Sequence, residues 1–182
     1  MNFNLTECRK VLHNDLMNAL TAKREAIRDL HKVEELWAIS YDIIPWDPYI
    51  GIAFRLESES GFNASLKSGD WKHSHFIEDC TSKELVPARD YVHAQFQSAG
   101  DDGKRAQEMA HLIFLAAADA LLDESVALLL QSAQINAPVI GDTLPCNYFK
   151  YIVIDEDGVI KANYCDIVCA NRVTKRLLGK VI

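Results

Sequence analysis

Residues 101–134, DDGKRAQEMAHLIFLAAADALLDESVALLLQSAQ, constrain the fold more than any other part of the chain. They consist largely of Ala, Leu, Met and Gln, which are strong helix formers. The stretch is too long for one surface helix, and the DES sequence at 123–125 offers an N-cap in its middle. We therefore predict two helices, at about 103–122 and about 125–134, with much of their surface apolar and buried.

The N-terminus carries a second helical signal. Asn4 followed by Glu7 is typical of a capping box. Apolar residues then recur at spacings of three and four from Leu5 to Leu30. This pattern predicts one long amphipathic helix that extends towards His31.

Residues 36–56 change to the alternation of a β-hairpin. In the first strand the alternation predicts four large side chains on one face: Trp37, Ile39, Tyr41 and Ile43. PWDP at 45–48 contains two prolines, which cannot donate to a strand ladder, and alternation resumes at 50–56. We expect an antiparallel hairpin with Trp46 and Asp47 at its tip.

The remaining elements complete an α+β fold. A short helix is predicted within 82–97, with Pro87 near its first turn. Residues 147–165 suggest a second hairpin around an Asp-Gly turn at 157–158, and a closing helix at about 166–178 would turn Leu178 inward. The prediction is one domain, residues 1–182: an antiparallel sheet built from two hairpins and covered by N-terminal, central and C-terminal helices.

Charge and composition limit the classes of ligand and partner that this chain suits. The net charge is −7, from 26 acidic and 19 basic side chains, and no basic run could neutralise nucleic-acid phosphates. A basic protein partner suits this charge better. The N-terminus lacks the apolar core of a signal peptide, and no stretch is apolar enough to span a bilayer, so a cytoplasmic protein with reduced thiols is expected. Phosphate-binding loops are missing and no cofactor is indicated.

GDWKHSHFIEDC at 69–80 is the stretch richest in chemical groups. His73, His75 and Cys80 are of zinc-ligand types, but a structural zinc site usually has two well-spaced ligand pairs and only one H-x-H is present. The alternative is a polar connection in which Trp71 anchors the chain to the core by burying its ring. The sequence favours the connection and leaves the three residues as weak metal candidates.

The tip of the predicted hairpin is a candidate binding surface. Rigid exposed aromatic residues are common interface anchors, although Trp46 could also fold back onto the sheet as a corner plug. Acidic residues near it in sequence would steer and anchor a basic partner. The predicted binding residues are Trp46, Asp42, Asp47, Glu57 and Glu59.

The order of elements, with LWAISYDI, DWKHS and YIVIDEDG in succession, resembles uncharacterised bacterial domains of unknown function, some of them presumed immunity proteins of polymorphic toxin systems. The resemblance implies a small, acidic, cytoplasmic protein that blocks a partner by covering its surface. No functional residue is carried over from it.

Three functions are therefore weighed. The first is a non-enzymatic, acidic protein-binding domain, and it is the leading hypothesis. The second is a metal-dependent or Cys/His hydrolase around His73, His75 and Cys80, which requires these side chains to converge in a pocket. The third is a homo-oligomer whose long apolar helices pair across a two-fold axis, which requires one apolar face of residues 112–122 to be exposed.

Overall fold

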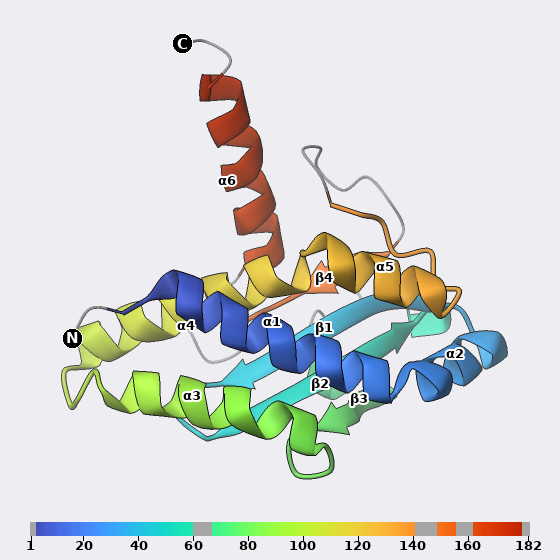
Figure 1. The fold of residues 1–182 in the computed structure, drawn as a ribbon, viewed down its shortest axis with the longest axis horizontal. Helices are drawn as coiled ribbons and strands as arrows, with labels where there is room; N and C mark the ends of the chain where they lie inside the picture. The colour runs from blue at the N-terminus through green and yellow to red at the C-terminus, as the bar shows by residue number, and fades with distance from the viewer. Residues whose placement is uncertain (1–2, 60–66, 141–148, 156–161, 180–182) are drawn as a thin grey trace.

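The computed structural model describes residues 3–59, 67–140, 149–155 and 162–179 (Figure 1). The helices are α1 (Leu5–Ala22), α2 (Arg24–Val33), α3 (Val86–Gln97), α4 (Gly103–Leu121), α5 (Glu124–Ser132) and α6 (Tyr164–Gly179). The strands are β1 (Leu36–Ile44), β2 (Tyr49–Leu56), β3 (His73–Glu78) and β4 (Lys150–Ile152), with short 3₁₀ turns at Glu57–Glu59, Ser68–Asp70 and Lys83–Leu85. None of the helices in the described ranges is long and apolar enough to cross a lipid bilayer.

The strands form one sheet in the order β3-β2-β1-β4. β1 pairs antiparallel with β2, which confirms the first hairpin, and β2 pairs antiparallel with β3. β4 pairs parallel with β1, so the sheet is mixed and not built from two antiparallel hairpins. The α+β class is confirmed, whereas the predicted turn at 157–158 lies outside the described residues.

The strand pairings depart from the prediction for a topological reason. A strand reached through a tight turn must run antiparallel, but a strand reached through helices can enter the sheet in either direction. β4 follows α4 and α5, and it reaches the free edge of β1 in the parallel sense. Periodicity along the chain carries no information on this choice.

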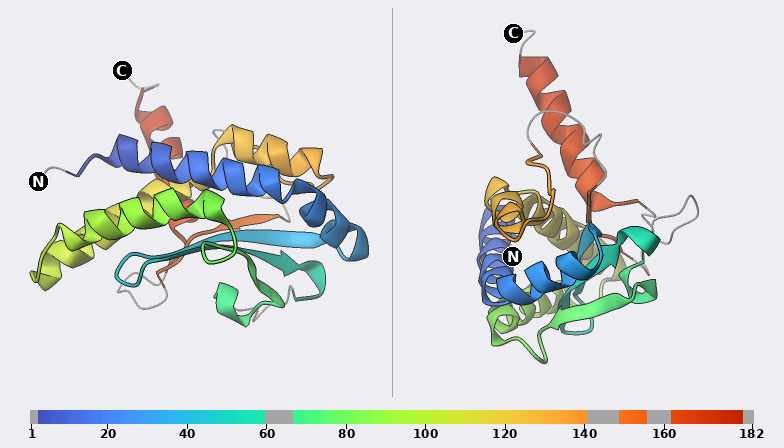
Figure 2. Two further views of the ribbon diagram at one scale, coloured as in Figure 1. Left: turned by 60° about the horizontal axis from the view of Figure 1, so that its bottom comes forward. Right: turned by 90° about the vertical axis from the view of Figure 1, so that its right-hand side faces the viewer.

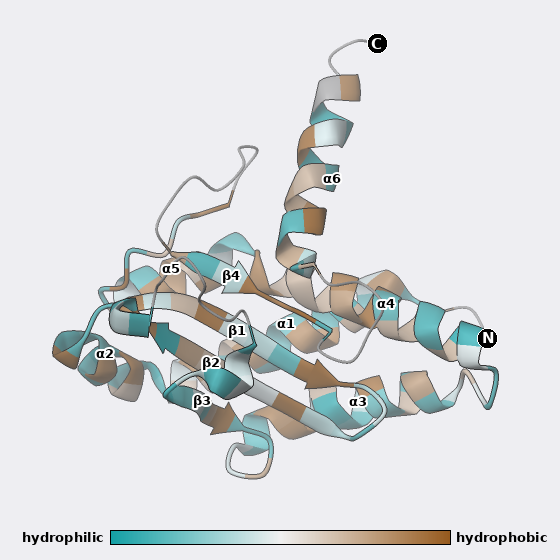
Figure 3. Ribbon diagram, turned by 180° about the vertical axis from the view of Figure 1, so that it is seen from behind, coloured by the Kyte–Doolittle hydropathy of each residue, from teal (hydrophilic) through white to brown (hydrophobic). Residues whose placement is uncertain are grey.

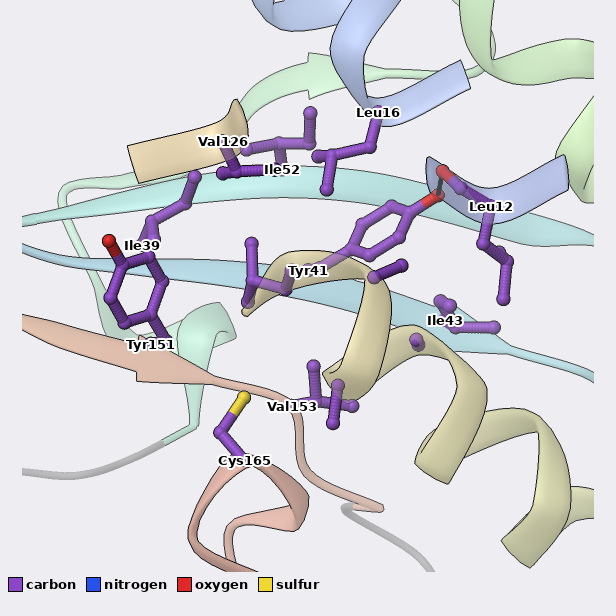
Figure 4. Close-up of a cluster of buried hydrophobic side chains, with 14 of the residues drawn as sticks. Leu12, Leu16, Ile39, Tyr41, Ile43, Ile52, Val126, Tyr151, Val153 and Cys165 are labelled. Atoms are coloured by element: carbon purple, nitrogen blue, oxygen red, sulfur yellow. Dashed lines mark hydrogen bonds between the residues drawn. The ribbon is translucent and has the colours of Figure 1, made fainter. Parts of the chain in front are cut away.

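The main core lies between one face of the sheet and helices α1, α3, α4 and α5 (Figures 1 and 4). Tyr41 of β1 is buried there and donates a hydrogen bond from its hydroxyl to the Leu12 carbonyl at 3.3 Å. The central helices bury their apolar residues within the same chain, among them Ile113, Phe114 and Leu121. The apolar face that the homo-oligomer hypothesis requires on residues 112–122 is therefore occupied.

A β-bulge corrects the predicted faces of β1. The register shifts between Leu36 and Ala38, so Leu36 enters the main core and Trp37 packs on the opposite face of the sheet. An extra residue in one strand re-aims the side chains on either side of it. The expected grouping of Trp37 with Ile39 is wrong for this reason, while Ile39, Tyr41 and Ile43 do share the core face (Figure 4).

The N-terminal helical pattern is divided in two. Asn4 caps α1 by accepting the Glu7 N–H at 3.1 Å, as predicted. The helix then breaks at Lys23, whose backbone leaves the helical region, and α2 continues in a new direction. The break allows Ile27 to be buried against the same core as α1.

Helix α6 leaves the body of the protein (Figures 1 and 2). Its first two turns pack against α4 and β4 through Tyr164, Cys165, Val168 and Cys169. Beyond these turns the helix projects away, and Leu178 is 62% exposed. The prediction that Leu178 faces inward is wrong because the apolar spacing continues past the point where the body ends.

A network of ions ties the root of α6 to α1 and α4. The Asp119 carboxylate forms ion pairs with the guanidinium groups of Arg9 at 2.5 Å and Arg172 at 2.6 Å. Arg9 also pairs with the Asp123 carboxylate at 2.7 Å. Asp123 caps α5 by accepting the Ser125 N–H at 3.0 Å. Burial alone would raise the pKa of Asp123, but the hydrogen bonds from Ser125 and Arg9 outweigh it and lower that pKa to about 2.

This network predicts an acid-sensitive contribution to stability. The folded pKa of Asp123 is below its unfolded value of about 3.9, so its ionised form stabilises the fold above that value, and the contribution is lost as the pH falls towards 2. Asp123→Asn should remove about 2 kcal/mol of this pH dependence from the free energy of unfolding. Urea unfolding between about pH 6 and pH 2 measures it.

The matched control is Glu124→Gln, an exposed residue in the first turn of the same helix. Its pH dependence should follow that of the wild type. Equal slopes for wild type and Asp123→Asn below pH 4 would contradict the assignment.

Candidate binding pocket at the hairpin tip

The second face of the sheet, which is turned towards the viewer in Figure 3, carries a small hydrophobic cluster of its own. Trp71 is 5% exposed and packs on Ala38, Ala53 and Ile152, which confirms its predicted role as an anchor. The buried guanidinium of Arg55 lies 5.6 Å from the centre of the Trp71 ring. Small side chains on β1 and β2 make room for this ring against the sheet.

Next to this cluster, a pocket of about 300 Å³ opens where the tip of the β1-β2 hairpin meets β3 and the chain after β4. Its described lining comes from five parts of the chain. These residues are Asp42, Ile43, Ile44, Trp46, Asp47, Tyr49, Ser68, Gly69, Ser74, His75, Phe114, Ile154 and Asp155. Three of the five predicted binding residues lie here, together with one of the weak metal candidates.

Carboxylates dominate the charge of the pocket. Asp42, Asp47 and Asp155 reach it from β1, the hairpin turn and the segment after β4. Asp42 is held in place by the buried Ser40 hydroxyl, which donates to its Oδ1 at 2.5 Å. Among the described lining residues, His75 is the only one that can carry a positive charge.

Tyr49 forms one wall of the pocket because Gly51 has no side chain to block its ring. The Tyr49 ring folds across Gly51, where an added Cβ would clash with the phenol oxygen. The hydroxyl then lies 3.3 Å from His75 Nδ1 and 3.4 Å from Glu78 Oε1. Burial and the nearby charges of Asp42 and Glu78 raise the pKa of Tyr49, so the phenol stays neutral and acts as a donor.

Trp46 combines the two roles that the sequence left open. Its ring meets Phe96 of α3 edge to face, with centroids 6.1 Å apart, and it is still 38% exposed. One part of the ring is thus fixed by the body while another part lines the pocket. A fixed aromatic surface of this kind can accept a ligand without losing much conformational entropy.

The two remaining predicted binding residues lie elsewhere. Glu57 and Glu59 follow the far end of β2, and an eight-residue strand spans roughly 23 Å. The Glu59 carboxylate accepts the backbone N–H groups of Leu56 at 2.9 Å and Lys72 at 2.8 Å. It therefore fastens the Trp71 segment to the sheet, and the five residues do not form one patch.

The metal candidates do not converge. His73 lies against the Phe76 ring, with centroids 6.3 Å apart, while His75 pairs with Glu78 at 2.7 Å. Cys80 is exposed and lies 3.6 Å from the other Glu78 oxygen. Within the described residues, no three His, Cys, Asp or Glu side chains are placed to hold a metal ion.

The surroundings of Cys80 also do not suit nucleophilic catalysis. Desolvation by neighbouring atoms and the nearby carboxylate of Glu78 raise the pKa of its thiol. An activated cysteine needs a lowered pKa, because the thiolate is the nucleophile. The thiol of Cys80 is therefore protonated at neutral pH.

Sequence reasoning missed several residues of the pocket. Tyr49 and Gly51 alternate on one face of β2, so an aromatic side chain folded over a strand glycine was a usable signal. The sequence pattern assigns Asp155 to the predicted hairpin of residues 147–165 and Phe114 to an apolar helix, and neither assignment indicates a binding site. Both reach the pocket through the parallel β4 pairing and helix packing, for which no local signal exists.

The two tryptophans should differ in their effect on stability. Trp71→Ala should lower the free energy of unfolding by about 3 to 5 kcal/mol because it empties a buried site beside a buried arginine. Trp46→Ala should cost only about 1 kcal/mol, since it loses one aromatic contact. Urea unfolding of both variants measures this difference. Equal losses of unfolding free energy would contradict the assignment of Trp71 as a buried anchor and Trp46 as a partly exposed pocket residue.

Comparison of the chain with protein-family models, curated proteins and solved structures finds no significant match in any of the three. The layout resemblance to immunity proteins therefore remains a hypothesis, and the pocket itself carries the functional argument.

Proposed function

We propose that this protein is a non-enzymatic binding domain that recognises a basic surface of a protein partner through the hairpin-tip pocket. The observation that carries the proposal is a pocket that combines three aspartates with the fixed, partly exposed ring of Trp46. A cationic side chain of the partner would enter this pocket.

Electrostatics supports a cation as the ligand. The described part of the pocket lining has three carboxylates and one histidine, which is paired with Glu78, and the whole chain carries a net charge of −7. Charge of one sign steers a partner of opposite sign and raises its rate of association. The neutral Tyr49 phenol adds a hydrogen-bonding group at the wall without a competing charge.

The shape of the pocket supports arginine in particular. A guanidinium group stacks on aromatic rings and can bind a carboxylate through two parallel hydrogen bonds. Trp46 offers the ring, while Asp42 and Asp47 offer carboxylates on the same lining. A volume of about 300 Å³ lies at the lower end of the range for ligand pockets and is large enough for one arginine side chain.

An inhibitor of the immunity type is one form that such a domain takes, since it would cover a basic surface of a toxin. The hydrolase alternative receives less support. Its proposed residues, His73, His75 and Cys80, do not share a pocket, and the pKa of the Cys80 thiol is raised.

The test uses a fluorescein-labelled peptide with one central arginine between glycines, and a matched peptide with the neutral isostere citrulline. Fluorescence anisotropy should show that the arginine peptide binds about tenfold more tightly or better. Asp42→Asn with Asp47→Asn should abolish that preference. Raising the salt from about 0.05 M to about 0.5 M should weaken binding, because exposed charges are screened.

Glu57→Gln is the matched control, because it removes an exposed carboxylate at the far end of β2. This variant should bind the arginine peptide as the wild type does. Equal affinity for the arginine and citrulline peptides, or an equal loss in Glu57→Gln, would refute the assignment of binding to the pocket.

A further inference from the structure

A second pocket, of about 290 Å³, lies where α6 leaves the body, between the start of α1, the second half of α4 and one face of α6 (Figure 1). Its α6 residues are 168, 171, 172 and 175, and spacings of three and four place them on the same side of the helix. The described lining shares no residue with the hairpin-tip pocket. The two pockets are therefore separate sites.

The inner part of this second pocket is apolar. Ala116 of α4 and Val168 of α6 are buried, and Leu115 is half-buried beside them. Leu5 of α1 lines the same pocket and is 45% exposed. A ligand with an apolar chain would remove this leucine surface from water, which favours binding.

Cationic side chains surround the apolar part. Arg9, Arg172 and Lys175 belong to the lining, and Asp119 is the one carboxylate of the described lining. Asp119 pairs with both arginines, and Arg9 also pairs with Asp123. Three cations and two carboxylates leave an excess of one positive charge here, although the whole chain carries a net charge of −7.

These cations still have hydrogen-bonding groups to offer. The ion pairs of Arg9 use its Nε and Nη2 atoms, whereas a guanidinium group carries five N–H groups in all. The side chains of Arg9 and Arg172 remain 34% and 31% exposed. Within the described ranges Lys175 forms no ion pair, and its side chain lines the pocket. The pocket thus presents donors to an anion above an apolar surface.

We propose that the pocket between α1, α4 and α6 binds a small monocarboxylate with a short apolar chain, such as a short- or medium-chain fatty acid. The carboxylate lies against Lys175 and the arginines, because guanidinium and carboxylate groups match in geometry. The chain lies along Leu5, Ala116 and Val168. One negative charge offsets the local excess, whereas a phosphate monoester, with a charge nearer two, exceeds it. A volume of about 290 Å³ is at the lower end of the range for ligand pockets, which suits a short chain.

The experiment is a ¹⁵N NMR titration of the full chain with sodium hexanoate, and with 1-hexanol as the neutral ligand of the same chain length. Hexanoate should shift the backbone amide signals of residues 5–9, 115–119 and 168–175 in a saturable way, with a Kd of about 10 mM or tighter. Hexanol should bind about tenfold more weakly, because it lacks the charge-assisted hydrogen bonds.

Lys175→Glu should weaken hexanoate binding about tenfold, since it replaces an attractive charge by a repulsive one. Lys175→Arg keeps the charge and should bind within about twofold of the wild type. The matched control is Lys83→Glu, which makes the same change in net charge at an exposed position before α3 and should bind as the wild type does.

Four outcomes would overturn the proposal. The first is a lack of saturation at about 50 mM hexanoate. The second is equal affinity for hexanoate and hexanol, and the third is a set of shifts confined to signals outside the three segments. The fourth is an equal loss of affinity in Lys175→Glu and Lys83→Glu, which would show a general effect of net charge. None of these results depends on the arginine-peptide assay, so the two binding proposals fail or hold separately.

Discussion

The arrangement of the molecule depends on β1, which pairs with a neighbouring strand at each edge and buries side chains on both faces of the sheet. Its large side chains, such as Ile39 and Tyr41, enter the main core beneath the helices. Its other face carries Ala38 and Ser40, which are small and buried. Because helices cover only the first face, the second is left for Trp71 and for the pocket beside it (Figure 3).

The pocket owes its chemistry to the ends of these strands. Asp42 lies near the end of β1 and is oriented by Ser40, while Asp47 lies in the turn that follows. Tyr49 begins β2, and its ring is placed by the absence of a side chain at Gly51. Strand ends bring polar groups together on a rigid support, which is the usual setting for a preorganised binding site.

The histidine-rich segment has a different role from the one its composition suggested. The 73–78 segment is a sheet strand, and Glu78 is the residue that organises its polar groups by contacting His75, Tyr49 and Cys80. Two of these three neighbours, Tyr49 and His75, line the pocket, so this carboxylate supports the pocket wall from behind. The carboxylate also helps to keep the Tyr49 phenol neutral.

The local features of the fold could be predicted from the sequence, and the non-local ones could not. The cap at Asn4, the division of the central helices at Asp123 and the anchor role of Trp71 follow from short-range rules and are confirmed. The bulge that re-aims Trp37 and the parallel pairing of β4 depend on partners distant in sequence.

The candidate site divides in the same way. Trp46, Asp42 and Asp47 are close in sequence and share the pocket, but Glu57 is one strand length away. Proximity in sequence suggested one patch, but the residues at the two ends of a strand lie far apart. Asp155 joined the pocket only through the tertiary fold.

The most direct test of the central claim is a ¹⁵N NMR titration with acetyl-arginine amide, followed at the indole N–H signals of Trp37, Trp46 and Trp71. The account predicts that the Trp46 signal shifts progressively, while the signal of the buried Trp71 changes little. No shift at Trp46, or equal shifts at all three indoles, would contradict the claim that the hairpin-tip pocket binds a cationic side chain.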